Sequence, residues 1–339
     1  MKRNYLYINL KVIWLISALA FIAGCQISVN PEDLLEKAAQ LIDQGENKPA
    51  VEILRPFIYH HRDNFRAHFL MGQAFLNTDV ENEKNLYIAR YYFNKARDLA
   101  VNESQRQQAD IAYADIKLLM GKANQSGEIL LETAERVSRM GRKGQATLFC
   151  MQATSRFIEE TEYDSAREAC ETGEKYAETQ NQRLELKLGL ATAYFLENEY
   201  EECFEILKDF PENFESDRHI TVLDPIFLKN AVNLMKMEGK RNLLNPWKWK
   251  KKFDDDSEKL YLSNFDSALH HYKETQSQLD EKSIKLVAES WLAIAEHSKE
   301  NGMINQARQA YELSQKLFLK ASNENRALFV GKKLEDLDS

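Results

Sequence analysis

The segment from Ala89 to Ala96, ARYYFNKA, decides the fold. It places a small residue at Ala89, a bulky one four positions later at Phe93, and a second small residue at Ala96. At helical spacing these three side chains lie on one face of an α-helix. A small residue lets a second helix approach closely, and the bulky residue fills the space beside it. The segment therefore predicts a helix that packs tightly against a neighbouring helix.

The same signature recurs along the chain at a nearly constant interval. The spacings between the leading small residues are 39, 37, 40, 37, 65 and 39 positions, and the single long interval indicates an insertion. A period of this length is typical of stacked helical repeats. The copies are Ala50-x3-Leu54, Ala89-x3-Phe93-x2-Ala96, Ser126-x3-Leu130, Ala166-x3-Cys170-x2-Gly173, Cys203-x3-Leu207, Ala268-x3-Tyr272 and Ala307-x3-Tyr311-x2-Ser314.

A second signature with a large-small-large rhythm precedes several copies. It occurs in His68-x2-Met71-Gly72-x2-Phe75, Lys187-x2-Leu190-Ala191-x2-Tyr194 and Trp291-x2-Ile294-Ala295-x2-Ser298. Together the two signatures resemble the tetratricopeptide repeat (TPR), whose pattern is W-x2-L-G-x2-Y followed by A-x3-F. The resemblance implies an all-α, right-handed superhelical solenoid of about seven helical hairpins over residues 31–321. A capping helix and tail are expected at 322–339.

The N-terminal residues have the anatomy of a secretory leader. Lys2, Arg3 and Lys11 precede the apolar run VIWLISALAFI at 12–22, and small residues follow it. A membrane-spanning helix needs about 20 apolar residues, so this run is too short to span. We therefore expect residues 1–24 to be a cleaved signal peptide.

The four residues from Ile22 to Cys25, IAGC, resemble the bacterial lipobox. The resemblance implies cleavage between Gly24 and Cys25, a lipid on the Cys25 thiol, and a tether over residues 25–30. The alternative is an ordinary leader with a cysteine there by chance. Gln26 stands where lipoproteins of the inner membrane commonly have aspartate, which favours the outer membrane, periplasmic face. Inner-membrane retention and surface exposure stay open.

The charge of the chain limits its partners. The full sequence has a formal net charge of −8, and removal of a leader with three cations and no acid leaves −11. This balance argues against nucleic acid, which is bound by neutralising phosphates. It also argues against broad electrostatic adhesion to anionic lipid.

No catalytic or metal-binding motif is present in the sequence. The G-x-S-x-G, Walker, H-E-x-x-H and dinucleotide patterns are all missing, and His60-His61 and His270-His271 are adjacent pairs that diverge by about 100° on a helix. The chain also contains no C-x-x-C or Cys/His zinc spacing. We therefore predict no catalytic residue, no metal, no cofactor, no small-molecule substrate and no enzymatic activity.

Three cysteines remain after Cys25, namely Cys150, Cys170 and Cys203. An exported protein meets an oxidising compartment, so two of them could form a disulfide. The alternative is that all three are small buried core residues. An odd number means that at least one stays unpaired.

An insertion is predicted at 238–263, EGKRNLLNPWKWKKKFDDDSEKLYLS. Trp247, Lys248, Trp249 and Lys250 suit a protruding element that contacts a membrane interface or a pocket of a partner. The alternative is a loop that folds back on the solenoid, with its cations neutralised by the adjacent acids.

The TPR resemblance also implies a concave groove lined by the first helices of successive hairpins. By register the candidate residues pair an apolar side chain with the residue four positions later. Such apolar residues suit a groove or a buried core equally well. The pairs are Phe69 and Gln73, Ile111 and Asp115, Leu188 and Thr192, and Leu292 and Glu296.

These features predict a lipid-anchored periplasmic scaffold that binds envelope proteins or peptides and supports assembly of an envelope machine. The architecture resembles that of TPR lipoproteins serving pilus secretins, outer-membrane protein assembly and cell-wall enzyme complexes. The alternative is an accessory subunit of a polysaccharide or protein export apparatus, and a cell-wall enzyme with an unrecognised site ranks below both. Fold alone does not choose among them, and the oligomeric state is left open.

Overall fold

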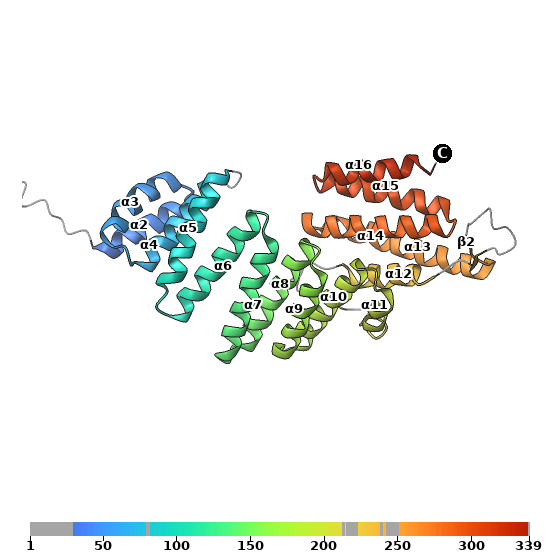
Figure 1. Ribbon diagram of the computed structural model, residues 1–339, viewed down its shortest axis with the longest axis horizontal. Coiled ribbons are helices and arrows are strands. Elements are labelled where there is room, and N and C mark those ends of the chain that lie inside the picture. Colours follow the sequence, from blue (N-terminus) through green and yellow to red (C-terminus); the bar gives the residue numbers. More distant parts are fainter. Residues whose placement is uncertain are drawn as a thin grey trace, which may run out of the picture. The chain divides into compact units, whose positions relative to one another are not determined.

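The computed structural model describes residues 30–78, 82–211, 214, 223–237, 240–241 and 251–337. The chain divides into two compact units, Met1–Ile116 and Lys117–Ser339. Over the described residues there are fifteen α-helices, which in chain order form seven consecutive pairs and a final helix (Figure 1). The all-α prediction of TPR-like helical hairpins is confirmed. The predicted leader and Cys25 lie outside the described residues.

Unit 1 consists of short helices joined by tight turns. Its first helix is capped by Asn30, whose side-chain oxygen accepts a hydrogen bond from the Glu32 amide at 3.2 Å, and Pro31 occupies the first helical position. The last helix of unit 1 continues three residues into unit 2. The helices are α2 (Pro31–Asp43), α3 (Asn47–His60), α4 (Phe65–Thr78), α5 (Glu83–Leu99) and α6 (Glu103–Leu119).

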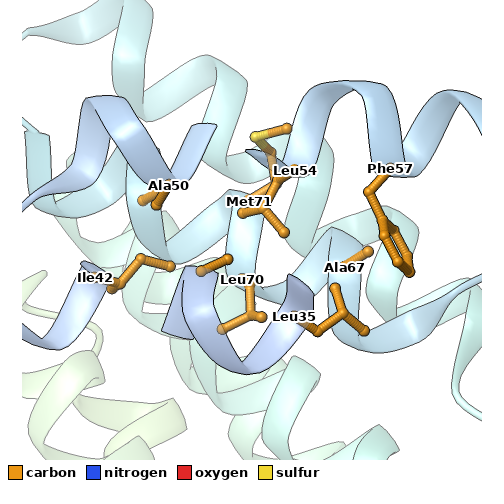
Figure 2. Packing of buried hydrophobic residues seen from close by; sticks show 10 residues of the cluster. Leu35, Ile42, Ala50, Leu54, Phe57, Ala67, Leu70 and Met71 are labelled. Atoms are coloured by element: carbon orange, nitrogen blue, oxygen red, sulfur yellow. The ribbon is translucent and has the colours of Figure 1, made fainter. Parts of the chain in front are cut away.

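The core of unit 1 begins where α2, α3 and α4 meet. Figure 2 shows Leu35 and Ile42 from α2 facing Leu54 from α3 and Met71 from α4. All four side chains are buried. A single hairpin could not cover these residues, because a third helix supplies part of the contact.

The two sequence signatures meet in space, which explains their residue types. A Cβ atom added at Gly72 of α4 would lie only 2.7 Å from the ring of Phe93 on α5. In unit 2 the same would hold for Gly127 against Phe157 and for Gly173 against Leu186, again at 2.7 Å. The small residue of one helix therefore makes the space that the bulky residue of the next helix fills.

Unit 2 extends the same arrangement through ten complete α-helices of the described chain. Ion pairs link successive hairpins, such as Arg167 of α9 with Glu197 at the end of α10. The helices are α7 (Ala123–Arg139), α8 (Lys143–Glu159), α9 (Tyr163–Tyr176), α10 (Gln180–Leu196), α11 (Tyr200–Leu207), α12 (Pro225–Met235), α13 (Asp255–Thr275), α14 (Glu281–Glu300) and α15 (Ile304–Lys320), followed by α16 (Glu324–Glu335). A short 3-10 helix, Gln276–Gln278, separates α13 from α14.

The predicted insertion at 238–263 is too long at its C-terminal side. Residues 255–263 belong to α13, and the Asp254 side chain caps this helix by accepting from the Ser257 amide at 2.9 Å. The acidic run that resembles a loop in sequence is instead a favourable first helical turn, because acids stabilise a helix N-terminus. Before it, β1 (Lys240–Arg241) pairs antiparallel with β2 (Lys251–Lys252). Trp247, Lys248, Trp249 and Lys250 lie outside the described residues.

The closing segment expected at 322–339 contains α16, which packs on α15. Within the described ranges, no helix combines the length and apolar character needed to cross a membrane.

Candidate functional site

Unit 2 contains a cavity of about 710 Å³. Its walls come from the C-terminal ends of α6, α8 and α10, from the turns that follow these helices, and from α14 and the start of α16. A volume of this size is within the usual range for a binding pocket. Helices that are distant in sequence therefore line one cavity inside a single unit.

Three similar turns bring the cavity walls together. Gly121, Thr161 and Asn198 each adopt a left-handed conformation, with φ of 67°, 62° and 69°. At Gly121 the amide donates to the Leu118 carbonyl at 2.8 Å, and the next amide, of Lys122, donates back to Lys117 at 2.9 Å. This is the hydrogen-bond pattern that ends a helix and reverses the chain. Successive hairpins therefore present equivalent turns to the cavity.

The floor of the cavity is apolar. Ile158 and Phe195 come from the last turns of α8 and α10, and Leu286 and Leu292 come from α14. These side chains are largely buried, yet they border the cavity. Such a surface gains free energy when an apolar group covers it, because apolar area is then removed from water.

The charged residues around the floor are mostly paired with one another. Lys282 of α14 donates to Glu159 of α8 at 2.6 Å, although the two residues are 123 positions apart in the chain. Arg326 of α16 binds both carboxylate oxygens of Glu289 at 2.9 and 2.7 Å. Bidentate pairs of this kind fix geometry as well as charge. Lys285 is exposed at the cavity and forms no ion pair within the described chain.

Tyr163, at the start of α9, also borders the cavity and is half-buried. Burial raises the pKa of its phenol above the ordinary value, and the Glu289 and Glu197 carboxylates raise it further, against the opposing effect of Arg326. The hydroxyl therefore stays protonated at neutral pH. It is a neutral hydrogen-bond donor at the cavity edge.

The predicted groove residues are only partly brought together. Leu292 lines the cavity, and Glu296, one turn further along α14, forms an ion pair with Lys333 of α16 at 2.9 Å. Phe69 is half-buried between the rings of Phe65 and Phe93, at 5.8 and 5.6 Å between centroids.

The other unit 1 candidates differ in exposure. Gln73 and Ile111 are half-buried, and Asp115 is exposed. None of these residues is among those that line the cavity of unit 2.

The prediction is wrong for Leu188 and Thr192, which are fully buried. The Thr192 hydroxyl donates to the Leu188 carbonyl at 2.8 Å and accepts from the Leu223 amide at 3.3 Å, so both residues belong to the interior. The reason is that Leu188 and Thr192 lie on the buried side of α10, whereas Arg183, Lys187, Leu190 and Tyr194 follow one another at helical spacing on its more exposed side.

Sequence reasoning missed most of the residues that line the cavity. Gly121 gave a usable signal, because a glycine after a helical segment predicts a turn. The sequence holds no such signal for Ile158, Leu286 or the Lys282–Glu159 pair, because their proximity depends on how hairpins that are distant in the chain pack together. Within the described ranges, no three His, Cys, Asp or Glu side chains gather as a metal site would require.

The three cysteines of unit 2 are buried free thiols. Burial raises the pKa of Cys150, Cys170 and Cys203 to about 12. Only the thiolate is a good nucleophile, so these groups are inert in the native protein at neutral pH. The structure thus agrees with the core interpretation and shows no disulfide among these three residues.

The raised pKa values predict how the thiols respond to pH. In the chain from residue 26 onward, we expect no reaction with Ellman's reagent near pH 8 in the native state and reaction of all three thiols in concentrated guanidinium. An unfolded thiol has a pKa of about 8.5. The stability that the neutral buried thiols contribute is therefore complete below that pH and is lost as the pH rises toward about 12. Rapid labelling of the native protein at pH 8 would contradict this prediction.

No protein-family model matches the chain, and no curated protein matches it. Solved structures with a similar fold include the C-terminal part of a TPR repeat-containing protein from Cytophaga hutchinsonii, with a TM-score of 0.47, 13% identity, and coverage of 86% of this chain and 98% of that one. PilF of Pseudomonas aeruginosa has a TM-score of 0.40 and 12% identity, covering 74% of this chain and 97% of its own. The quorum sensor NprR from B. thuringiensis has a TM-score of 0.41 and 11% identity, covering 98% and 94%.

Similarity at this level concerns the fold alone. The helix pairs, their turns and the matching of small with bulky residues define the class directly. The chain is an all-α protein built of TPR-like helical hairpins.

Proposed function

We propose that the chain is a protein-binding scaffold and that the cavity of unit 2 holds an apolar segment of a partner protein. The observation that carries this proposal is the apolar floor, formed by Ile158, Phe195, Leu286 and Leu292 inside a cavity of about 710 Å³. Apolar anchors seated in such pockets supply much of the affinity in protein interfaces.

The paired charges around the floor support this choice of occupant. Glu159 and Glu289 are neutralised by Lys282 and Arg326, so the charged groups beside the apolar floor form two closed pairs, while Glu160, Glu281 and Lys285 also line the cavity. Lys285 and the Tyr163 hydroxyl stand at the edge as donors. A partner segment with apolar side chains and an acceptor beside them fits this arrangement.

The cavity can be tested by site-specific photocrosslinking in cells. Benzoylphenylalanine at Lys285, which is exposed at the cavity, should capture the partner, whereas the same residue at exposed Lys316 on α15 should not. Ala293 of α14 also lines the cavity. Placing a charge there with Ala293→Glu should remove the Lys285 adduct while the helical circular dichroism is retained. Equal adducts from both positions, or an adduct that survives Ala293→Glu, would reject the cavity as the binding site.

We further propose that Cys25 anchors this scaffold by lipid in the periplasm, at the outer membrane, and that its partners are envelope proteins. The support is the lipobox-like IAGC at 22–25 after a basic and apolar leader. Several acyl chains hold a protein firmly to a bilayer. A Cys25→Ala chain should leave the membrane fraction, and full retention there would show that the anchor is elsewhere.

The machine that the scaffold serves is proposed by class only. Assembly of a pilus or secretin, of outer-membrane proteins, or of a cell-wall enzyme complex fits a tethered binding array, and an export apparatus is the second candidate. Crosslinked partners identified from the membrane fraction discriminate among these. Purified chain that hydrolysed an envelope polymer would instead make the protein an enzyme.

Residues 247–250 are a second proposed contact, based on the Trp247 and Trp249 pair with its lysine neighbours. Replacing residues 242–250 with a short glycine-serine linker preserves both strands and α13. Loss of a partner from this variant would support the proposal, and an unchanged partner set would exclude it.

A further inference from the structure

Unit 1 carries three exposed tyrosines on its second helices. Tyr59 on α3 is 68% exposed, and Tyr87 and Tyr91 on α5 are 52% and 57% exposed. Two of these rings have a guanidinium group over them, Arg62 at 5.7 Å from the Tyr59 centroid and Arg90 at 5.1 Å from that of Tyr87. An aromatic ring beside a cation can contribute both apolar contact area and positive charge to a binding surface.

The exposed tyrosines belong to neighbouring parts of unit 1. Tyr92 of α5 touches the Tyr91 ring at 5.2 Å, and it also packs against the core that α3 helps to form. Burial raises the pKa of Tyr92, and the Arg55 guanidinium of α3 is close enough to oppose that rise. Tyr59 follows Arg55 by one helical turn. We call Tyr59, Arg62, Tyr87, Arg90 and Tyr91 the tyrosine–arginine face.

The charge of these helices differs from that of the whole chain. Apart from Arg97, which pairs with the buried Asp110, α3 and α5 carry five lysine and arginine residues against three acids, although the chain has a net charge of −8. At physiological salt the screening length is about 8 Å, so distant acids do not cancel a local cationic surface. The cations are Lys48, Arg55, Lys84, Arg90 and Lys95, and the acids are Glu52, Glu83 and Asp98.

The position of unit 1 in the chain limits what lies next to it. Under the proposed anchor at Cys25, the tether of residues 25–30 precedes Pro31, the first residue of α2. An extended chain reaches at most about 3.6 Å per residue, so a six-residue tether can reach no further than about 20 Å. The bilayer that holds the lipid is therefore within reach of unit 1.

We infer that the tyrosine–arginine face docks unit 1 onto a bilayer surface that contains anionic phospholipid. Tyrosine is enriched at membrane interfaces, and basic side chains near the surface are attracted to anionic headgroups. The inference rests on the anchor in the proposed function, because the tether gives weak contacts a high effective concentration. The net negative charge argues against adhesion of the chain as a whole to anionic lipid, whereas the docking inferred here involves only one face of unit 1.

The test uses the chain from residue 26 onward, which retains every helix of the described residues and has no lipid. At low salt it should sediment with vesicles of phosphatidylcholine and phosphatidylglycerol in a seven-to-three ratio, and not with phosphatidylcholine alone. Arg62→Glu/Arg90→Glu should weaken this partition at least about tenfold. Tyr87→Ser/Tyr91→Ser should weaken it as well, because the rings no longer enter the interface.

Lys316→Glu/Lys320→Glu on α15 is the matched control, with the same change in charge at exposed positions of unit 2. This control should bind as the unchanged chain does. The inference is overturned if the unchanged chain ignores the anionic vesicles, or if the control loses as much binding as Arg62→Glu/Arg90→Glu. The proposed lipid anchor is tested separately, by measuring whether the Cys25→Ala chain stays in the membrane fraction of cells.

Discussion

Replacing Trp291 by alanine is expected to lower the free energy of unfolding of unit 2 by about 3–5 kcal/mol. Trp291 is fully buried on α14, and its ring lies 5.6 Å from Phe227, 5.7 Å from Phe265 and 6.1 Å from Tyr272. These rings come from α12 and α13, so the substitution opens a cavity where three helices meet. The cost is large because the surrounding backbone closes only part of such a cavity.

Urea unfolding followed by circular dichroism measures this effect. Trp291→Phe should cost less than Trp291→Ala, since the benzene ring retains contacts with Phe265 and Tyr272. Leu319→Ala is the matched control, because Leu319 is a large apolar residue of the same unit that is 57% exposed. An exposed substitution of this kind usually changes stability by less than about 0.5 kcal/mol. Equal losses for Trp291→Ala and Leu319→Ala would show that this cluster does not stabilise unit 2.

The same substitution also tests the link between the core and the proposed site. Leu292, the next residue of α14, borders the cavity, while Leu286 borders it from more than one turn earlier. Without the packing of the Trp291 ring, α14 is held less firmly, and Leu286 and Leu292 no longer keep their positions in the cavity floor. Capture of a partner by benzoylphenylalanine at Lys285 should then fall together with stability.

The repeat motifs predicted packing because they encode contacts between adjacent helices. Gly72, Phe93 and Trp291 all stand in these motifs, and all three are buried in the structure. A contact between sequence neighbours leaves a periodic trace, since one residue type is needed at one position of each hairpin. The fold class could therefore be predicted from the sequence.

The cavity could not be predicted in this way, because it depends on distant hairpins. Glu159 and Lys282 meet at 2.6 Å, but nothing periodic relates α8 to α14. The register argument also failed at Leu188 and Thr192, which lie on the buried side of α10, while Lys187 and Tyr194 lie on its more exposed side. A register shifted by one or two residues thus exchanges an exposed position for a core position.

The insertion shows a different limit of sequence reasoning. Asp254, Asp255 and Asp256 resemble a charged loop, yet they cap and begin α13. Acids favour both loops and helix N-termini, so composition alone cannot separate the two. Only the structure separates the two here, because it shows that these acids begin a helix of 21 residues.

A second large loss of stability is expected in unit 1 for Asp110→Ala. Asp110 of α6 is 1% exposed, and its carboxylate accepts from Arg97 of α5 at 2.6 Å and faces Arg106 at 3.5 Å. Arg97 is itself mostly buried and stacks over Tyr113 at 4.7 Å. Removing the carboxylate leaves a desolvated guanidinium without its counter-charge, which typically costs about 3–5 kcal/mol.

We attribute the expected loss to the unpaired buried charge that Asp110→Ala leaves on Arg97, and not to a large net stabilisation by the ion pair itself. Replacing both partners, as in Arg97→Leu/Asp110→Leu, should therefore recover most of the stability that Asp110→Ala loses. Asp98→Ala on α5 is the matched control, because Asp98 is exposed and its removal should have little effect. Urea unfolding of the four chains measures these differences, and molar salt should change them little because Asp110 is shielded from solvent. A double variant that is less stable than Asp110→Ala would mean that this pair, and not hydrophobic packing, holds α5 to α6.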